Sequence, residues 1–511
     1  MRSSSYIIQS RLEDGKWILV HGYSGAVDVV EPGVVEFLAA ASRGDFVPGA
    51  SSGERFRLCA ADVETLTSRC YITNRSEEEE REITSRLAAA LHRQNQRHPG
   101  IGGVIVPTYD CNLRCRYCYE RRLQEHGRAW LGATMTCEKV DAVYAFLERS
   151  AEMGGQSAAE GTLPPTTQPR PVPKHMTLLG GEPLLARNRE LVLYILRQGV
   201  ERGYEFSVIS NATELDAFLP ELAGLNVKFI QITLDGLKHT HDRRRFGPQR
   251  EGSFDRIVPN VGRALRAGLR VSLRVNVDAT NFDEVRALAE LAGREGWVGS
   301  PTFDMYVAPV YTGAGKCGLD ESVALPDAQL AEKMADLHRA VPSARIVRHA
   351  PAVERVFMGL FRSGQYLGFK GEFCGSSGAM HIFDPYGKMY ACWESVGQRV
   401  GELGSYFPQV AYDEAAVESW RGRVVTSIPQ CRACKYALLC GGGCPQHAYN
   451  ANGSLRSPAC RDFQRVLDTG LPVFYRKFLQ EQGAGREGAV PGQAQPPGMG
   501  ATVGAVAGER G

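Results

Sequence analysis

Three cysteines within eight residues carry the clearest chemical signal in this sequence. Cys111, Cys115 and Cys118 stand at positions i, i+4 and i+7, and no fourth cysteine lies nearby. An iron–sulfur cluster of the cubane type takes one cysteine at each iron in ordinary electron carriers, so three thiols leave one iron free to hold another group. A structural zinc site needs four ligands, typically from two close pairs, and this spacing does not supply them. The loop therefore indicates an iron–sulfur site with one open position.

The cysteine loop resembles the signature of the radical SAM enzymes, Cys-x3-Cys-x-aromatic-Cys, in which Tyr117 supplies the aromatic residue. The resemblance implies that Cys111, Cys115 and Cys118 bind a [4Fe–4S] cluster and that S-adenosyl-L-methionine (SAM) chelates its fourth iron. In that family, one electron from the cluster cleaves the sulfonium of SAM into methionine and a 5′-deoxyadenosyl radical. The cofactor supplies the difficult step, while the protein orients it and excludes side reactions.

Polar loops that follow the predicted strands add candidates for binding the cofactor. Gly180-Gly181-Glu182-Pro183 follows one strand, and its two glycines let the backbone approach a ligand without interference from a Cβ atom. Parallel barrels place their sites at the carboxyl ends of the strands, where these loops lie. The resemblance implies cofactor contacts from Tyr117, Gly180, Gly181, Glu182, Ser210, Asn211, Thr233, Asp235, Arg245 and Arg274. Asn276 is a further candidate.

A second group of seven cysteines lies between Cys374 and Cys460, with Gly441-Gly442-Gly443 among them. Zinc is the rival metal here, because Cys431-x2-Cys434 would begin a zinc ribbon. The spacing resembles the SPASM extension of radical SAM enzymes, which houses two auxiliary [4Fe–4S] clusters. That resemblance implies two ligand sets, one made of Cys431, Cys434, Cys440 and Cys460, and the other of Cys374, Cys392 and Cys444.

Two positions depart from the sulfatase-maturating relatives within this extension. Those relatives have a further cysteine where this chain has Met380, so the fourth ligand of the second set is either substrate or a distant residue such as Cys317. They also have an aspartate that takes the substrate proton where this chain has Trp393, whose indole has no basic site. Glu394 follows, but in a strand its side chain would point elsewhere. The proton acceptor is therefore unassigned.

Composition limits the class of protein. With 511 residues, 43% of them hydrophobic and 23% charged, the chain predicts a soluble globular protein of two to four domains. A formal charge of +2 gives no case for nucleic-acid binding, and Arg243-Arg244-Arg245 is expected to be a solvated surface turn. No apolar segment approaches the roughly 20 residues that span a bilayer, and no signal peptide is recognisable. We expect a cytoplasmic protein without membrane partners, whose cysteines bind metal rather than form disulfides.

The chain from about residue 100 to 309 alternates strand and helix, which predicts an α/β fold with a parallel sheet. Six such units match the partial (β/α)6 TIM-like barrel of the radical SAM family, whose open side would admit a large substrate such as a peptide. A stretch rich in Gly, Ser, Thr and Pro, residues 154–173, is expected to be a surface insertion. The predicted strands are 103–107, 175–179, 205–209, 228–234, 270–275 and 302–307.

The flanking segments complete the predicted domain organisation. Residues 1–97 predict an N-terminal winged-helix-like module, which resembles the RRE-like modules that bind leader peptides as an added strand in many peptide-modifying enzymes. A cap that merely covers one end of the barrel is the alternative. The other predicted units are a radical SAM barrel at 98–310, a helical bridge at 311–370, an auxiliary iron–sulfur SPASM domain at 371–482 and a disordered tail at 483–511.

These motifs predict a radical SAM oxidoreductase that modifies a ribosomally synthesised peptide, as a RiPP maturase does. Hydrogen abstraction by the 5′-deoxyadenosyl radical would lead to a thioether or carbon–carbon crosslink, or to epimerisation. The expected partners are a precursor peptide or protein and an electron donor such as ferredoxin or flavodoxin. Two alternatives stay open: an anaerobic sulfatase maturase that forms formylglycine, and a non-catalytic binding protein stapled by zinc.

Overall fold

One mixed sheet of eleven strands organises most of the chain. In order across the sheet the strands are β12-β11-β10-β9-β8-β7-β6-β13-β14-β15-β16. From β12 to β13 all neighbours are parallel, and from β13 to β16 they are antiparallel. The computed structural model describes residues 1–43, 58–96, 102–157, 174–310, 321–349, 357–361, 368–460 and 463–486.

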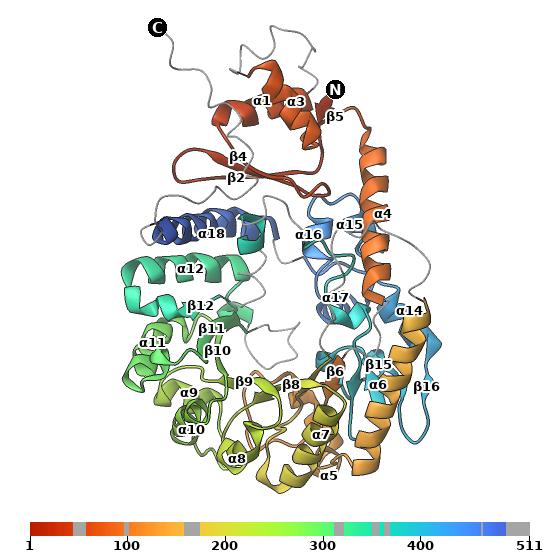
Figure 1. The fold of residues 1–511 in the computed structure, drawn as a ribbon, viewed down its shortest axis with the longest axis vertical. Helices are drawn as coiled ribbons and strands as arrows, with labels where there is room; N and C mark the ends of the chain where they lie inside the picture. The colour runs from red at the N-terminus through yellow and green to blue at the C-terminus, as the bar shows by residue number, and fades with distance from the viewer. Residues whose placement is uncertain are drawn as a thin grey trace.

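The parallel part of the sheet is the predicted α/β barrel. All six predicted strands are present, with bounds within two residues of those expected, and β12 adds a further parallel strand at the edge. The helices that follow the strands lie outside the sheet (Figure 1), and they bury its aliphatic side chains in the largest apolar core of the described residues. The parallel strands are β6 Gly102–Ile105, β7 His175–Leu178, β8 Glu205–Ser210, β9 Val227–Thr233, β10 Val271–Val277, β11 Phe303–Pro309 and β12 Val347–Arg348.

The helices of the barrel alternate with its strands, as the sequence predicts. Helix α6 continues to Ser157 and so enters the insertion expected at 154–173, of which residues 158–173 lie outside the described residues. None of the described helices is both long and apolar enough to cross a membrane. The helices of this part are α5 Arg128–Leu131, α6 Cys137–Ser157, α7 Arg189–Glu201, α8 Leu219–Leu222, α9 Lys238–Arg244, α10 Phe254–Arg266 and α11 Val285–Arg294.

The cysteine-rich segment continues the barrel sheet. Strand β13 pairs in parallel with β6, and a meander of three more strands extends the sheet from there. The edge of β6 is thereby covered, and the second cysteine group is anchored to the same sheet that carries the first. The elements of this segment are β13 Ile382–Phe383, β14 Lys388–Tyr390, β15 Glu402–Ser405, β16 Ala411–Tyr412, α14 Glu414–Arg421, α15 Pro429–Arg432, α16 Ala437–Cys440 and α17 Pro445–Asn452.

A small antiparallel sheet followed by helices forms the N-terminal module. Strands β2 and β3 form a hairpin, with Gly15 in its turn at a φ of 87°. The sheet is β2 Ile7–Arg11, β3 Trp17–His21 and β4 Val27–Val30, and a second pair joins β1 Arg2–Ser3 to β5 Ile72–Thr73. The helices are α1 Pro32–Ser42, α3 Ala60–Ser68 and α4 Glu77–Gln96.

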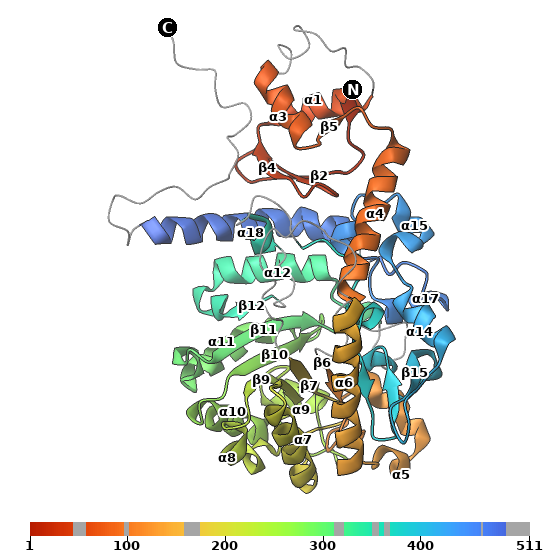
Figure 2. The ribbon, with the colours of Figure 1, turned by 45° about the vertical axis from the view of Figure 1, so that its right-hand side comes forward.

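The last helix, α18 Phe463–Arg486, lies between the N-terminal sheet and α12 Asp327–Ala340 in both ribbon views (Figures 1 and 2). Its buried residues Leu471 and Phe474 share one apolar core with Ile8 and Ile18 of the small sheet. The helix runs to Arg486, four residues past the expected domain end at 482, and residues 487–511 of the expected tail lie outside the described residues. The two ends of the chain therefore stabilise each other through apolar burial.

Helix α4 connects the N-terminal module to the second cysteine group. It runs alongside the C-terminal segment in both ribbon views (Figures 1 and 2). His92 Nδ1 lies 2.9 Å from Glu372 Oε2, and Asn95 Nδ2 donates a hydrogen bond to Glu372 Oε1 at 2.7 Å. Because Glu372 is two residues before Cys374, these contacts fix the loop that carries that cysteine.

Candidate active site

A cavity of about 440 Å³ opens at the carboxyl ends of the barrel strands, in the size range of small-molecule sites. Its wall is built from the ends of β7 to β11 together with the cysteine loop and a part of the second cysteine segment. The predicted residues that line it are Cys111, Cys115, Tyr117, Cys118, Gly180, Gly181, Glu182, Ser210, Asn211, Thr233, Arg245, Arg274 and Asn276.

The three cysteines of the loop are half-buried and line this cavity. Burial raises the pKa of Cys111 and Cys115, and neighbouring negative charges raise the pKa of Cys111 further. Thiolates in such a place need positive charge, which a metal cluster supplies. Leu113 N donates a hydrogen bond to Cys111 Sγ at 3.4 Å, and Asn211 Nδ2 does so at 3.9 Å. The donor set therefore fits an iron–sulfur cluster, whose potential depends on hydrogen bonds to its sulfurs.

A single-ion site is not built in the described part of the chain. No group of three or more His, Cys, Asp or Glu side chains there is placed to hold one metal ion. A structural zinc site would need four such ligands at about 2.0–2.3 Å from the ion.

Glu182 braces the cavity rather than facing it as a free acid. Its carboxylate accepts hydrogen bonds from Ser210 Oγ at 2.7 Å, Asn211 N at 2.6 Å and Leu184 N at 2.9 Å. Burial raises the pKa of Glu182 to about 7, and these hydrogen bonds oppose the rise. Glu182 N donates to Asp110 O at 2.7 Å, so the brace joins the ends of β7 and β8 to the cysteine loop.

Gly181 makes that junction possible. A Cβ atom at this position would lie 2.1 Å from the carbonyl oxygen of Asp110, which is a distance no side chain can occupy. Its neighbour Gly180 has a φ of 109°, which favours glycine. The Gly-Gly pair thus lets the strand-end loop press against the loop that carries the cysteines.

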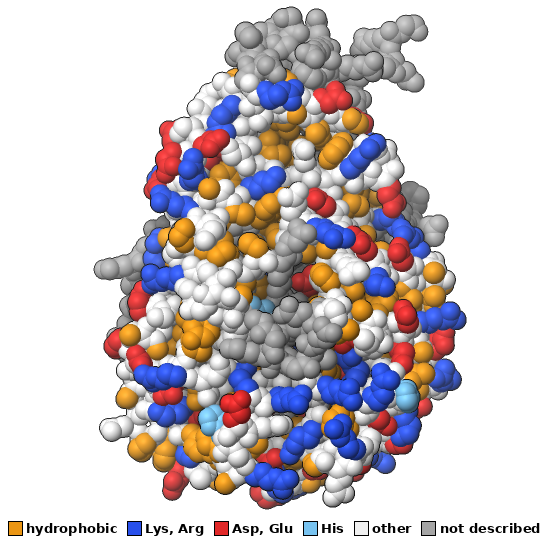
Figure 3. Space-filling model, turned by 180° about the vertical axis from the view of Figure 1, so that it is seen from behind, with side chains coloured by type: hydrophobic (Ala, Val, Ile, Leu, Met, Phe, Trp, Pro, Cys, Tyr) orange, Lys and Arg blue, Asp and Glu red, His pale blue; other side chains and the backbone are white. Residues whose placement is uncertain are grey.

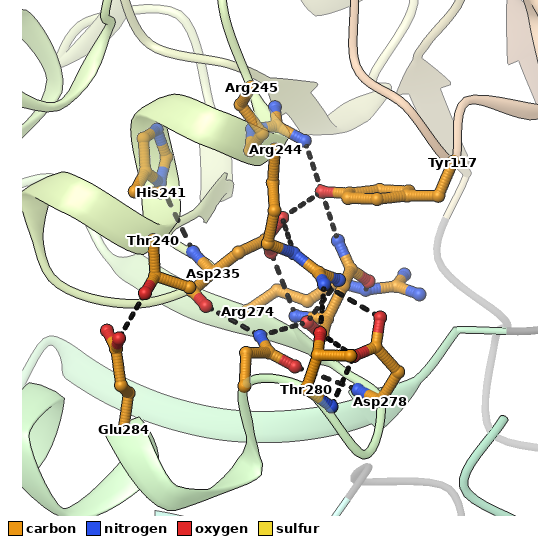
Figure 4. Close-up of polar contacts among 12 residues, drawn as sticks. Tyr117, Asp235, Thr240, His241, Arg244, Arg245, Arg274, Asp278, Thr280 and Glu284 are labelled. Carbon is orange, nitrogen blue, oxygen red and sulfur yellow. Dashed lines mark hydrogen bonds and ion pairs between the residues drawn. The ribbon is translucent and has the colours of Figure 1, made fainter. Parts of the chain in front are cut away.

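Tyr117 is fixed by a buried polar network beneath the cavity (Figure 4). Its hydroxyl accepts hydrogen bonds from Arg245 Nη1 at 2.8 Å and Asn276 Nδ2 at 3.1 Å, and it donates to Asp235. The Arg244 guanidinium lies over the Tyr117 ring, 5.2 Å from its centroid. Asp235 is fully buried and does not line the cavity, so the structure places it behind Tyr117 instead of against a ligand.

The expectation that Arg243-Arg244-Arg245 is a solvated surface turn is wrong for two of the three residues. Only Arg243 is exposed, whereas Arg244 and Arg245 are buried. Arg244 Nη1 pairs with Asp278 Oδ2 at 2.7 Å, which compensates its burial. Arg245 lines the cavity, and its Nε has no hydrogen-bond partner among the described residues. A fixed cation with a spare donor is suited to an anionic group of a bound ligand, such as a carboxylate.

The wall contributed by the second cysteine segment carries acid–base groups. Trp393, Glu394 and His447 line the cavity, and His447 Nε2 lies 3.1 Å from Glu394 Oε2. The expectation that Glu394 points elsewhere is wrong, because Trp393–Ser395 is a 3₁₀ turn rather than a strand. His447 was not predicted; its place three residues after Cys444, on a short helix, is the signal that marks it.

Several thiols of the second cysteine group lie close enough to raise one another's pKa. Burial raises the pKa of Cys431 to about 12, and the next contributions come from the thiolates of Cys434, Cys440 and Cys460. The pKa of Cys392 is raised by burial, then by Glu394, and then by Cys444 and Cys374. Cys317, named as a distant ligand, lies outside the described residues.

Buried Arg423 lies among thiols of both sets. Its guanidinium donates hydrogen bonds to the carbonyl oxygens of Leu455 at 2.6 Å and Gly442 at 2.9 Å. Burial lowers the pKa of Arg423, and the thiolates of Cys431, Cys444, Cys374 and Cys440 oppose that change. The structure thus places a cation where thiolate clusters would need one.

The sequence model of the Radical SAM superfamily matches residues 167–292. The cysteine loop lies before this range, and the structure brings it to the same cavity. The chain thus carries a radical SAM domain, and its fold is an α/β radical SAM fold.

Relatives in sequence cover different parts of the chain. GTP 3′,8-cyclase of Rhodopseudomonas palustris (strain TIE-1) is 27% identical over 186 residues, which are 36% of this chain and 46% of that protein. The chain thus spans about half the length of the cyclases that it matches. An uncharacterized protein of Archaeoglobus fulgidus is 23% identical over 386 residues, 73% of this chain and 81% of that protein.

Solved structures share the fold over a larger part of the chain. One is anSMEcpe with bound AdoMet, with 15% identity, a TM-score of 0.53, and coverage of 74% of this chain and 99% of that one. Another is Streptococcus suis SuiB bound to precursor peptide SuiA, with 15% identity, a TM-score of 0.51, and coverage of 91% and 99%. At these identities the likeness establishes the fold.

Proposed function

We propose that this protein is a radical SAM enzyme that modifies a ribosomally synthesised peptide. The observation that carries the proposal is the single cavity in which three cysteines, the strand-end loops and an acid–base wall meet. The fold shared with SuiB supports a peptide substrate, because that structure includes a precursor peptide and the likeness covers 91% of this chain. The substrate would enter through the open side of the cavity and meet Glu394 and His447.

The residues present would hold the cofactors as follows. Cys111, Cys115 and Cys118 would bind a [4Fe–4S] cluster, and the Arg245 fork would take the carboxylate of SAM. Tyr117 would be a rigid wall, because its hydroxyl is held at three points. When bound, these groups supply a 5′-deoxyadenosyl radical that takes a hydrogen atom from an unactivated carbon.

The second cysteine segment would be a SPASM domain with two auxiliary clusters. Their ligands would be Cys431, Cys434, Cys440 and Cys460 for one, and Cys374, Cys392 and Cys444 for the other. Arg423 would offset part of their negative charge. An auxiliary cluster would accept the electron when the product is oxidised.

His447 would accept the proton that an oxidised substrate loses. Its Nε2 faces Glu394 at 3.1 Å, which fixes the ring at the cavity wall. A general base held in this way contributes about 10²–10⁴-fold to a proton transfer. This assignment replaces the aspartate whose position is taken by Trp393.

The N-terminal module would grip the leader of the peptide. Its small sheet has two edges, β2 and β4, and an extended peptide can add a strand to such an edge. In this proposal residues 1–97 recognise the leader, 98–310 form the catalytic barrel, 311–370 bridge, and 371–482 hold the auxiliary clusters. The contacts of α4 with Glu372 connect recognition to the cluster region.

A sulfatase-type maturase is the second candidate. The fold shared with anSMEcpe supports it, with a TM-score of 0.53. Met380, Trp393 and the extra N-terminal module count against it. A zinc-stapled binding protein is a third candidate, which metal analysis separates from both enzymes.

Anaerobic reconstitution tests the proposal directly. We expect about twelve irons per chain for three cubane clusters, and formation of 5′-deoxyadenosine when SAM and dithionite are added. Cys115→Ala should abolish 5′-deoxyadenosine, whereas the exposed Cys137→Ala on α6 should leave it unchanged. Zinc without visible absorbance, or intact SAM after reduction, contradicts the enzymatic proposal.

Co-expression with candidate precursor peptides identifies the reaction. A loss of two mass units in the peptide indicates a crosslink. Deuterium incorporation from heavy water without that loss indicates epimerisation. Formylglycine in a sulfatase peptide would establish the second candidate instead.

A further inference from the structure

The cysteine loop is a wall between two hollows. Cys115 and Tyr117 line the active-site cavity, whereas Arg116 between them lines a second hollow of about 570 Å³. Side chains at the end of α9 also face the two hollows in turn: Arg243 lines the second hollow, and Arg245 lines the cavity. One residue layer therefore separates the outer hollow from the site of the cluster.

This outer hollow, called the basic hollow here, is strongly cationic. It is lined by Arg116, Lys238, His239, Asp242, Arg243, Phe246 and Arg250. Its four cationic side chains, those of Arg116, Lys238, Arg243 and Arg250, are all exposed. On the face shown in Figure 3, Lys and Arg side chains gather across the lower part of the molecule.

The charge of the basic hollow is neutralised only in part, at Lys238, which pairs with Asp242 and Asp255. Asp242 is the one acidic residue that lines it within the described part of the chain, and its Oδ1 already accepts hydrogen bonds from Ser253 N and Phe254 N, both at 2.9 Å. Its Oδ2 lies 3.1 Å from Lys238 Nζ. Arg116 and Arg243 have no carboxylate within ion-pair distance among the described residues, so their charges are available to a partner.

The two sides of the wall are held together by the main chain. Arg114 N donates a hydrogen bond to Phe246 O at 2.6 Å, and Arg116 N donates to Arg244 O at 3.1 Å. The Arg250 guanidinium lies 4.4 Å from the centroid of the Phe246 ring. The basic hollow is therefore a formed surface on the back of the cysteine loop.

We propose that the basic hollow docks an acidic one-electron carrier protein that reduces the cluster of the cysteine loop. The inference rests on the proposed function, because it needs a cluster on Cys111, Cys115 and Cys118. One electron passes from the reduced carrier to the oxidised cluster, with no bond formed and no proton moved. Complementary charge is what steers such weak, short-lived complexes, and docking here leaves the substrate side free.

Charge reversal in the basic hollow tests the proposal. The triple variant R116E/R243E/R250E is compared with R197E/R266E/R294E, which reverses three exposed arginines on the outer helices α7, α10 and α11. The probe is a plant-type [2Fe–2S] ferredoxin, with dithionite as the small-molecule reductant. Iron content and SAM binding of each variant are measured first, to confirm that the site is intact.

Two readouts decide the outcome. The Kd for ferredoxin, measured by calorimetry, should rise at least about tenfold in the basic-hollow variant and should stay within about twofold of the wild-type value in the control variant. Added salt should also raise the Kd of the wild type. Reduction of the cluster by ferredoxin should slow to a similar degree, while reduction by dithionite should stay unchanged. Equal behaviour of the two variants, or no binding to the wild type, overturns the proposal.

The failure of the proposed function is distinguishable from the failure of docking. If dithionite gives no 5′-deoxyadenosine in the wild type, the proposed function fails, and the binding readout still decides the docking surface. The proposal is overturned if duplex DNA binds the wild type as tightly as ferredoxin does and binds R116E/R243E/R250E more weakly. The basic hollow would then be a nucleic-acid binding surface.

Discussion

Arg245 Nη1 lies 2.8 Å from the hydroxyl of Tyr117, so the end of α9 holds the aromatic residue of the cysteine loop. The aromatic position of the motif is thus more than an apolar wall in this protein. Its hydroxyl ties the loop to β10 through Asn276 and to the turn after β9 through Asp235.

Tyr117→Phe removes the hydroxyl at the centre of the network. Buried Asp235 then loses a donor, and Arg245 and Asn276 lose an acceptor, which should lower the free energy of unfolding by about 1–3 kcal/mol. Anaerobic denaturant titration measures the change. Tyr194→Phe is the control, because its hydroxyl donates to Asp141 at the surface, and it should leave stability unchanged. Equal effects of the two variants would contradict a special role for Tyr117.

Arg245→Lys keeps a positive charge but loses the planar fork and the contact with Tyr117. We expect the Kd for SAM to rise about tenfold, which is about 1.4 kcal/mol. Equilibrium binding of SAM to the anaerobically reconstituted protein measures this. Arg243→Lys, two residues away on the outer face, should leave SAM affinity within about twofold. An unchanged Kd for Arg245→Lys would remove Arg245 from the SAM site.

His447→Gln should separate radical formation from product formation. In the proposed function SAM binds at the other wall of the cavity, so 5′-deoxyadenosine should form within about twofold of the wild-type rate, while modified peptide falls by about 10²–10⁴-fold. The ratio of peptide product to 5′-deoxyadenosine is the measurement. His126→Gln, on an exposed 3₁₀ segment, is the control. Parallel loss of both products would make His447 a structural residue instead.

The sequence predicted the elements better than it predicted the burial of their polar residues. The six barrel strands could be predicted because each is a local run of β-branched and aliphatic residues, as in β10. Arg244 was predicted to be a surface residue because its ion-pair partner, Asp278, lies 34 residues later in the chain and gives no local signal. Glu394 was misplaced because side-chain direction in a short 3₁₀ turn depends on tertiary contacts.

His381 should make the protein lose stability in acid. Burial, and to a smaller extent the Arg421 guanidinium, lowers its pKa from 6.5 to about 3. The unfolded chain binds a proton below pH 6.5 that the folded protein does not, so stability falls as the pH drops below that value. Between pH 7.5 and pH 5.5 the loss is about 1.4 kcal/mol. Denaturant titrations at several pH values should show a shallower pH dependence in His381→Gln, whatever its stability at pH 7.5, and an unchanged one in His126→Gln.

Gly181→Ala should prevent the assembly of the site. The added Cβ would lie 2.1 Å from Asp110 O, and a backbone oxygen cannot move aside without displacing the cysteine loop. We expect a loss of at least about 2 kcal/mol in stability and a reduced iron content after reconstitution. Gly299→Ala is the matched control, because its Cβ would meet nothing within 4 Å. If Gly181→Ala bound iron and SAM as the wild type does, the close contact between these two loops would not be what positions the cysteines.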